Sequence, residues 1–160
     1  MPKMKELRDA SSHPGAAFFR RQIEMQALAV AGWIAWAEDR HEEALALLCY
    51  AADEEDALGK HPVSPGAIVP IRELPGDLYL EADRPAEALA AFERSLPLNP
   101  GRYRATAGAA RAAERAGRTE IAPDHYRKLL DLARDGEGQR PETAQAKAFL
   151  EAEPSRVTSR

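Results

Sequence analysis

The sequence contains few side chains that could perform catalysis or hold a metal ion. The residues that could support such chemistry are a single cysteine, the acidic run DEED (Asp53 to Asp56) and four histidines, His13, His41, His61 and His125. None of the usual spacings is present: the sequence has no HExxH, no CxxC, no Gly-rich phosphate loop and no nucleophile motif. We therefore expect no catalytic residue, no metal site and no cofactor, and keep an enzymatic or metal-binding role through these groups as the weaker alternative.

Two of these features have simpler interpretations. His41 and Cys49 are eight residues apart and could share one face of a helix, but a lone cysteine more often packs as a small apolar residue. The DEED run lies in the C-terminal half of an expected helix, where the helix dipole disfavours negative charge. We interpret the run as a solvated face, as most charge runs are.

The composition of the whole chain limits the classes of protein to which it can belong. The chain has 160 residues, a mass of 17.5 kDa, a formal net charge of −4 and a pI near 5.6, with charges of both signs interspersed. Nucleic acids and anionic membranes both require a concentrated basic surface, so we expect neither as a partner. The longest uncharged apolar run, Ala27 to Ala37, is about half the length that spans a bilayer. With one cysteine and nothing like a signal peptide at its N-terminus, the chain is expected to be a soluble cytoplasmic protein.

Two segments of the chain repeat each other. DRHEEALALL (Asp39 to Leu48) and DRPAEALAAF (Asp83 to Phe92) agree at six of ten positions, 44 residues apart. A shift of 34 residues aligns the second segment with a third, in which Gly117 stands in the place of Asp83. Each unit is therefore predicted to be two helices joined by a short polar turn, at Glu38–Arg40, Ala82–Arg84 and Ala116–Arg118.

Each predicted hairpin carries a small residue in both helices and a large residue in the second helix. A small side chain lets the partner helix approach closely, and the large one fills the space between successive hairpins. One hairpin cannot bury its apolar face by itself, so the hairpins must stack. The small residues are Gly32, Gly76 and Ala110 in the first helices and Ala44, Ala88 and Ala122 in the second, and the large ones are Leu48, Phe92 and Tyr126.

This pattern resembles the tetratricopeptide repeat (TPR), a helix-turn-helix unit of 34 residues with small and large residues in these places and a closing proline. The best match is Gly76 to Pro100, followed by Ala109 to Ala133 and by the more divergent Ala31 to Ala52. The segment EDALGKHPVSPG (Glu55 to Gly66) is also similar to one found in bacterial TPR proteins of unassigned function. The resemblance covers roughly residues 16–135 and implies an all-α, TPR-like α-solenoid of three helix-turn-helix hairpins plus a C-terminal capping helix.

The sequence also predicts where the elements begin and end. We expect a flexible lead over residues 1–12, a helical domain over 13–153 and a frayed tail over 154–160. The repeat units span about 16–58, 64–100 and 102–135, and the capping helix spans 141–153. Helices are expected over 16–38, 41–58, 64–82, 85–98, 102–116, 119–134 and 141–153. Ser64 is expected to cap the third of these helices, and Pro75 inside it to cause a kink or a late start because proline lacks an N–H.

In TPR arrays the first helix of each hairpin lines a concave groove that holds the ligand, so the resemblance implies a similar groove here. Its candidate residues are Trp33 and Trp36 in the first unit, Glu73, Asp77 and Glu81 in the second, and Arg104, Arg111 and Arg115 in the third. The same stripe includes Gln26, Ala29, Leu80 and Glu114. These residues favour a non-catalytic scaffold for a protein or peptide partner, with the tryptophans as apolar anchors and the arginines as ligands for carboxylates.

Two other interpretations of these residues stay open. The three acidic side chains could pair with the three arginines of the neighbouring helix, and the tryptophans could pack in the core or against the end of the stack. Another possibility is a structural module that binds no separate ligand but associates with itself. A homodimer would then form through Phe18, Phe19, Ile23 and Met25 of the first helix.

Overall fold

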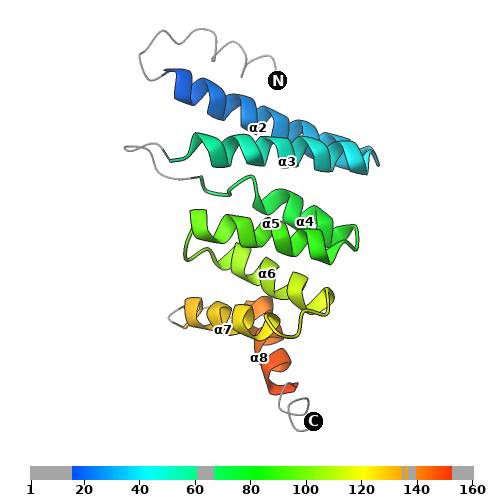
Figure 1. The fold of residues 1–160 in the computed structure, drawn as a ribbon, viewed down its shortest axis with the longest axis vertical. Coiled ribbons are helices and arrows are strands. Elements are labelled where there is room, and N and C mark those ends of the chain that lie inside the picture. The colour runs from blue at the N-terminus through cyan, green and yellow to red at the C-terminus, as the bar shows by residue number, and fades with distance from the viewer. Residues whose placement is uncertain (1–15, 61–66, 135, 137–139, 153–160) are drawn as a thin grey trace. The chain divides into compact units, whose positions relative to one another are not determined.

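The computed structural model describes residues 16–60, 67–134, 136 and 140–152, and within these residues it contains seven helices and no strand. The helices are α2 (Ala16–Ala37), α3 (His41–Leu58), α4 (Glu73–Glu81), α5 (Pro85–Leu98), α6 (Tyr103–Arg115), α7 (Ala122–Leu132) and α8 (Pro141–Ala152) (Figure 1). The predicted all-α class is therefore confirmed. The predicted lead over residues 1–12, the cap at Ser64 and the tail over 154–160 lie outside the described residues.

The chain divides into two compact units, Met1–Pro75 and Gly76–Arg160. The first unit contains the hairpin of α2 and α3 and the first residues of α4. The second unit contains the rest of α4, the helices α5 to α7 and the C-terminal helix α8. One helical domain over residues 13–153 stays a prediction.

The three predicted turns adopt one shared backbone geometry. Asp39, Asp83 and Gly117, which the repeat places in equivalent positions, all have a left-handed φ, of 60°, 56° and 68°. This conformation ends the first helix of each hairpin, because the amide that comes after it can then bond to a carbonyl of the last helical turn. Those bonds run from Arg40 to Ala35 (2.9 Å), from Arg84 to Tyr79 (2.8 Å) and from Arg118 to Ala113 (2.8 Å). The repeat in the sequence is thus a repeat of turn geometry.

Small residues bring the paired helices together, as the sequence predicts. A Cβ placed on Gly32 would lie 2.7 Å from Cγ of Leu48, and one placed on Gly76 would lie 2.7 Å from Cζ of Phe92. Neither glycine could become alanine without a shift of its neighbour. Gly108 of α6, which the repeat pattern does not single out, lies even closer to the ring of Phe92.

The helix α4 begins later than predicted. Residues 67–72 are not helical, so the expected helix over 64–82 is wrong in its first part, and α4 begins at Glu73. Pro75 is consequently the third residue of the helix, where a backbone N–H has no acceptor within the helix, so the missing N–H costs little. The late start expected at Pro75 is what the structure shows.

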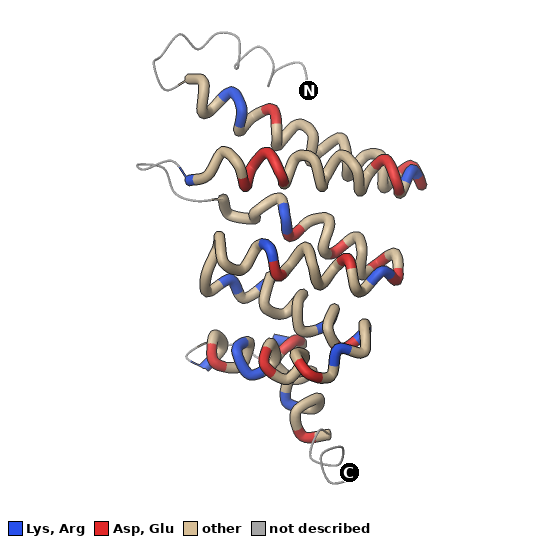
Figure 2. Tube along the Cα trace, viewed as in Figure 1, with Lys and Arg blue, Asp and Glu red and all other residues tan. Residues whose placement is uncertain are grey.

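The acidic run at the end of α3 is not a solvated face, and that interpretation is wrong. The guanidinium of the buried Arg72 donates to Asp53 and, over 2.6 Å, to Asp56. The carboxylate of Glu55 accepts the backbone N–H of Ile71 at 2.6 Å, and Glu54 pairs with Arg21 of α2. Figure 2 shows acidic positions along α3. The run therefore holds the segment that leads into α4.

The C-terminal helix α8 packs on the preceding hairpin of the second unit. Ala146 is fully buried, and Phe149 and Leu150 pack around it with Tyr126 and Leu129 of α7. These three residues of α8 form the apolar edge by which the helix covers the preceding hairpin. Among the described helices, none is both long and apolar enough to cross a membrane.

Candidate functional site

A stripe of exposed apolar side chains lies on α2 in the first unit. Phe19, Val30, Trp33 and Ile34 each keep between 40 % and 46 % of their surface exposed. An α-helix turns by about 100° per residue, which places these four side chains within an arc of about 100°. We call them the α2 stripe. Met25, Gly32 and Ala35 are buried on the opposite side of the helix, so the stripe is not part of the core formed by α2 and α3.

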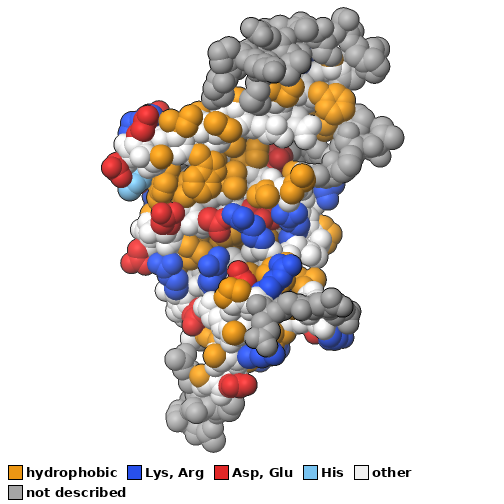
Figure 3. All heavy atoms as spheres, turned by 180° about the vertical axis from the view of Figure 1, so that it is seen from behind, with side chains coloured by type: hydrophobic (Ala, Val, Ile, Leu, Met, Phe, Trp, Pro, Cys, Tyr) orange, Lys and Arg blue, Asp and Glu red, His pale blue; other side chains and the backbone are white. Residues whose placement is uncertain are grey.

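The two candidate tryptophans have different surroundings. Trp33 belongs to the α2 stripe and is accessible. Trp36 is half-buried, and its ring stacks on the imidazole of His41 across the turn between α2 and α3, with centroids 4.2 Å apart and planes inclined by 30°. Trp36 therefore helps to hold the hairpin together, whereas Trp33 is available to a partner. In Figure 3, hydrophobic side chains gather on the visible face of the first unit.

The candidate residues for self-association are only partly exposed. Phe18 and Phe19 meet edge to face, with ring centroids 5.5 Å apart, and Phe19 is exposed. Ile23 is half-buried, and Met25 lies in the core. Met25 is thus unable to contribute to a dimer surface, which corrects that part of the prediction.

The candidate charges of the second unit are partly satisfied within it. Asp77 of α4 pairs with Arg104 of α6, as the interpretation based on local ion pairs expects. Arg115 donates to Asp83 and to the carbonyl oxygen of Leu80, each at 2.8 Å. The predicted pairing thus uses Asp83 of the turn where Glu81 of the helix was expected. Figure 3 shows basic and acidic side chains alternating on one face of this part of the chain.

Two of the charged candidates differ from the others. Glu73 is 0 % exposed, so a bound ligand would not reach it in this conformation. Arg111 is half-buried, and within the described residues its Nε atom has no hydrogen-bond partner. Among the predicted ligands for a carboxylate, Arg111 is therefore the one whose Nε atom is buried without a partner in the described residues.

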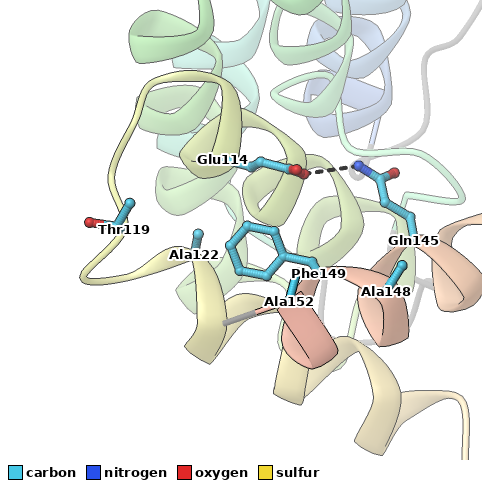
Figure 4. A pocket seen from close by; sticks show the side chains of 7 residues that line it. All are labelled: Glu114, Thr119, Ala122, Gln145, Ala148, Phe149 and Ala152. Carbon is cyan, nitrogen blue, oxygen red and sulfur yellow. Dashed lines mark hydrogen bonds between the residues drawn. The ribbon is translucent and has the colours of Figure 1, made fainter. Parts of the chain in front are cut away.

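A pocket of about 390 Å³ lies in the second unit, where α8 approaches the end of α6 and the start of α7. It is lined by Glu114, Thr119, Ala122, Gln145, Ala148, Phe149 and Ala152 (Figure 4). Of these residues the sequence analysis singled out Glu114 as part of the groove-facing stripe and Ala122 as the small residue of its helix. The pocket itself was missed, because its walls meet only through the packing of α8.

A hydrogen-bond network joins the three helices beside this pocket. The hydroxyl of Tyr126 donates to Oε2 of Glu114, and Nε2 of Gln145 donates over 3.0 Å both to the same Oε2 and to the hydroxyl of Tyr126. Burial and the bond to Glu114 raise the pKa of Tyr126 above its usual value, so its hydroxyl remains a donor at neutral pH. The ring of Phe149 stacks on that of Tyr126 with centroids 4.7 Å apart.

No metal site accompanies these features within the described part of the chain. No group of three or more His, Cys, Asp or Glu side chains is placed there to hold an ion. His125 contacts Glu93 at 3.3 Å, and His41 stacks on Trp36. Within these residues, the structure therefore contains no cluster of metal ligands that would support the metal-binding alternative.

Two solved structures resemble the chain over most of its length. One is described as the first TPR of Spaghetti (RPAP3) bound to the HSP90 peptide SRMEEVD, and it matches with a TM-score of 0.61 and 16 % identity over 80 % of this chain and 91 % of that chain. The other is the Sgt2 TPR domain from Aspergillus fumigatus, which matches with a TM-score of 0.63 and 16 % identity over 84 % of this chain and 81 % of that chain. No family model and no curated protein matches the chain.

Proposed function

We propose that the chain, which adopts the tetratricopeptide-repeat fold, is a non-catalytic scaffold that binds a protein or peptide partner. The likeness to two TPR domains confirms the predicted fold of helical hairpins. One of those domains is bound to a peptide, which supports peptide binding as the function of this fold here. A cytoplasmic location remains a prediction that rests on the single Cys49.

The α2 stripe is the observation that carries this proposal. Val30, Trp33 and Ile34 lie within two helical turns and expose large apolar side chains side by side. Exposed apolar groups that cluster in this way mark surfaces for association, whereas single ones are common on any protein. Tryptophan is among the residues that contribute most when a partner covers them. We therefore assign Trp33 as the main anchor for an apolar segment of the partner.

Charged contacts to the partner are proposed for α6. Arg104 and Arg115 already bind Asp77 and Asp83 within the second unit, so a partner's carboxylate would have to compete for them. Arg111 has a buried Nε atom with no partner in the described residues. That buried atom is itself closed to a partner, so a contact would use the terminal nitrogens of Arg111, which form no ion pair with Asp77 or Asp83. This supports Arg111 as the first choice for a charged contact.

The proposal is tested by selecting peptides from a random library on the immobilised full chain. We expect enriched peptides with large apolar or aromatic residues, and we expect the double variant Trp33→Ser/Ile34→Asp to retain none of them. The control is Tyr50→Ser in α3, because Tyr50 is 57 % exposed and lies outside the stripe. A selection that enriches no peptide on the wild-type chain would contradict the proposal, provided that circular dichroism shows the chain to be folded.

Self-association through the same surface is the second candidate. The α2 stripe extends from Phe19 near the start of the helix to Ile34 near its end, so two antiparallel copies could cover each other. Sedimentation equilibrium decides between the two candidates. A dimer that dissociates in the variant Val30→Glu would support self-association, and a monomer at all concentrations would exclude it.

A further inference from the structure

The pocket between α6, α7 and α8 carries one charge. Of its seven lining residues, Glu114 is the only ionisable one, and Ala122, Ala148, Phe149 and Ala152 form an apolar wall (Figure 4). All seven lie in the second unit. The pocket is thus separate from the α2 stripe, and a ligand bound in it would not require the function proposed for that surface.

Two hydrogen bonds beside the pocket hold the carboxylate of Glu114 by one oxygen. The hydroxyl of Tyr126 and the side-chain amide of Gln145 both donate to Oε2. Gln145 directs its amide nitrogen toward Glu114 and its carbonyl oxygen away (Figure 4). These two bonds fix the carboxylate beside the pocket, and within the described residues neither of them uses Oε1.

The apolar wall suits an alkyl chain that ends in a positive charge. Phe149 stacks on Tyr126 and also lines the pocket, so its ring offers both an apolar surface and a negative π-face. The alanines beside it present only methyl groups, against which a stem of methylene groups can pack. Lysine and arginine combine such a stem with a cationic head that donates hydrogen bonds but accepts none.

The basic residues near this pocket are largely engaged elsewhere. Arg115 binds Asp83 and Leu80, and Arg118 binds Glu120. Arg111 lies one turn before Glu114 on α6, but it does not line the pocket. The volume of about 390 Å³ lies at the low end of the range of about 300–1,000 Å³ found for ligand pockets, which fits one side chain better than a large cofactor.

We propose that this pocket binds a lysine or arginine side chain of a peptide, with Glu114 as the anionic ligand and Phe149 as the surface under the alkyl stem. An acidic side chain is excluded by the charge of Glu114. A neutral aliphatic side chain fills the same apolar wall but leaves the carboxylate without a counter-charge.

The test uses four capped tripeptides, Ala-X-Ala with X as lysine, arginine, norleucine or glutamate, titrated into the ¹⁵N-labelled full chain. Norleucine keeps a linear alkyl chain and removes the charge, so it isolates the contribution of Glu114. We expect the lysine and arginine peptides to shift the side-chain amide of Gln145 and the backbone amides of Ala148 and Ala152. Their dissociation constants should be about tenfold lower than that of the norleucine peptide, and the glutamate peptide should not bind.

The variant Glu114→Gln should remove the preference for the basic peptides, while its amide oxygen can still accept the bonds from Tyr126 and Gln145. Asp131→Asn is the matched control, since Asp131 is an exposed carboxylate of α7 that pairs with Arg134 away from the pocket. Equal binding of the norleucine and lysine peptides would overturn the proposal. So would a preference that survives in Glu114→Gln, or the absence of any shift with all four peptides.

Discussion

The ring of Phe92 lies against the backbone of Gly108 so closely that a Cβ placed on this glycine would be 2.4 Å from Cζ of the ring. The same ring contacts Gly76 on α4. One aromatic side chain of α5 thus packs against two glycines, one on the first helix of its own hairpin and one on the first helix of the next. The second unit depends on this arrangement, because Phe92 is fully buried there.

The variant Gly108→Ala is expected to destabilise the protein, although alanine normally favours a helix by about 1 kcal/mol over glycine. The added methyl group would overlap the ring of Phe92, and overpacking of this kind typically costs about 1–3 kcal/mol. Urea unfolding followed by circular dichroism measures the net effect. A Gly108→Ala variant as stable as the wild type would show that the ring can move away, and that the close contact is not required.

The turn geometry predicts changes in stability of opposite sign for substitutions at two equivalent positions. Asp39 holds a φ of 60°, a left-handed conformation that glycine adopts without strain, so Asp39→Gly should stabilise the protein by up to about 1 kcal/mol. Gly117 has a φ of 68° and open space around it, so Gly117→Ala should destabilise the protein by about 1 kcal/mol through backbone strain alone. Thermal unfolding of the two variants checks both signs. Shifts of the melting temperature in the same direction would contradict the shared turn geometry.

The carboxyl group of Glu55 makes the stability depend on pH. Burial raises the pKa of Glu55 above its usual value of 4.5. The bond from the N–H of Ile71 and the charge of Arg72 oppose this rise, whereas Asp56 and Glu73 add to it, and the net shift is upward. A raised carboxyl pKa means that the folded state binds its proton more tightly than the unfolded state, so ionisation of this group lowers stability as the pH rises above 4.5.

The variant Glu55→Gln keeps an oxygen that can accept the N–H of Ile71 and removes the charge. It should therefore be more stable than the wild type at pH 7, and the difference should disappear below the usual pKa of a glutamate. Unfolding free energies across this pH range measure the effect. Glu54→Gln is the control, because its partner Arg21 lies at the surface. A difference that stays constant with pH would argue against ionisation of Glu55 as its cause.

Much of the fold could be predicted from the sequence because the repeat encodes it locally. The turn positions Asp39, Asp83 and Gly117 align in the sequence and share one backbone conformation in the structure. The contact of Gly32 with Leu48 is predicted by the same pattern of small and large residues. Local geometry of this kind needs no knowledge of distant contacts.

The features that were missed depend on contacts between segments without periodic pattern. Arg72 binds the acidic run of α3 from a segment that is not helical, so helical spacing could not reveal the pairing. Glu73, which is fully buried, is the first residue of α4 in the structure and not an inner residue of a longer helix. The pocket near Glu114 depends on how α8 packs against α6 and α7, and its lining residue Gln145 belongs to no repeat. Sequence patterns identified both Trp33 and Trp36 as candidates. They could not show that Trp33 is exposed whereas Trp36 stacks on His41.

The central claim, that the chain binds a partner through the α2 stripe, is tested most directly by the affinity of one selected peptide for three forms of the chain. Isothermal titration would compare the wild type with Trp33→Ser and with the control Tyr50→Ser, after circular dichroism shows all three to be folded. We predict that Trp33→Ser weakens binding by more than about tenfold, as expected for an anchor residue, and that Tyr50→Ser leaves it within about twofold. Equal affinities for the wild type and Trp33→Ser would contradict the claim.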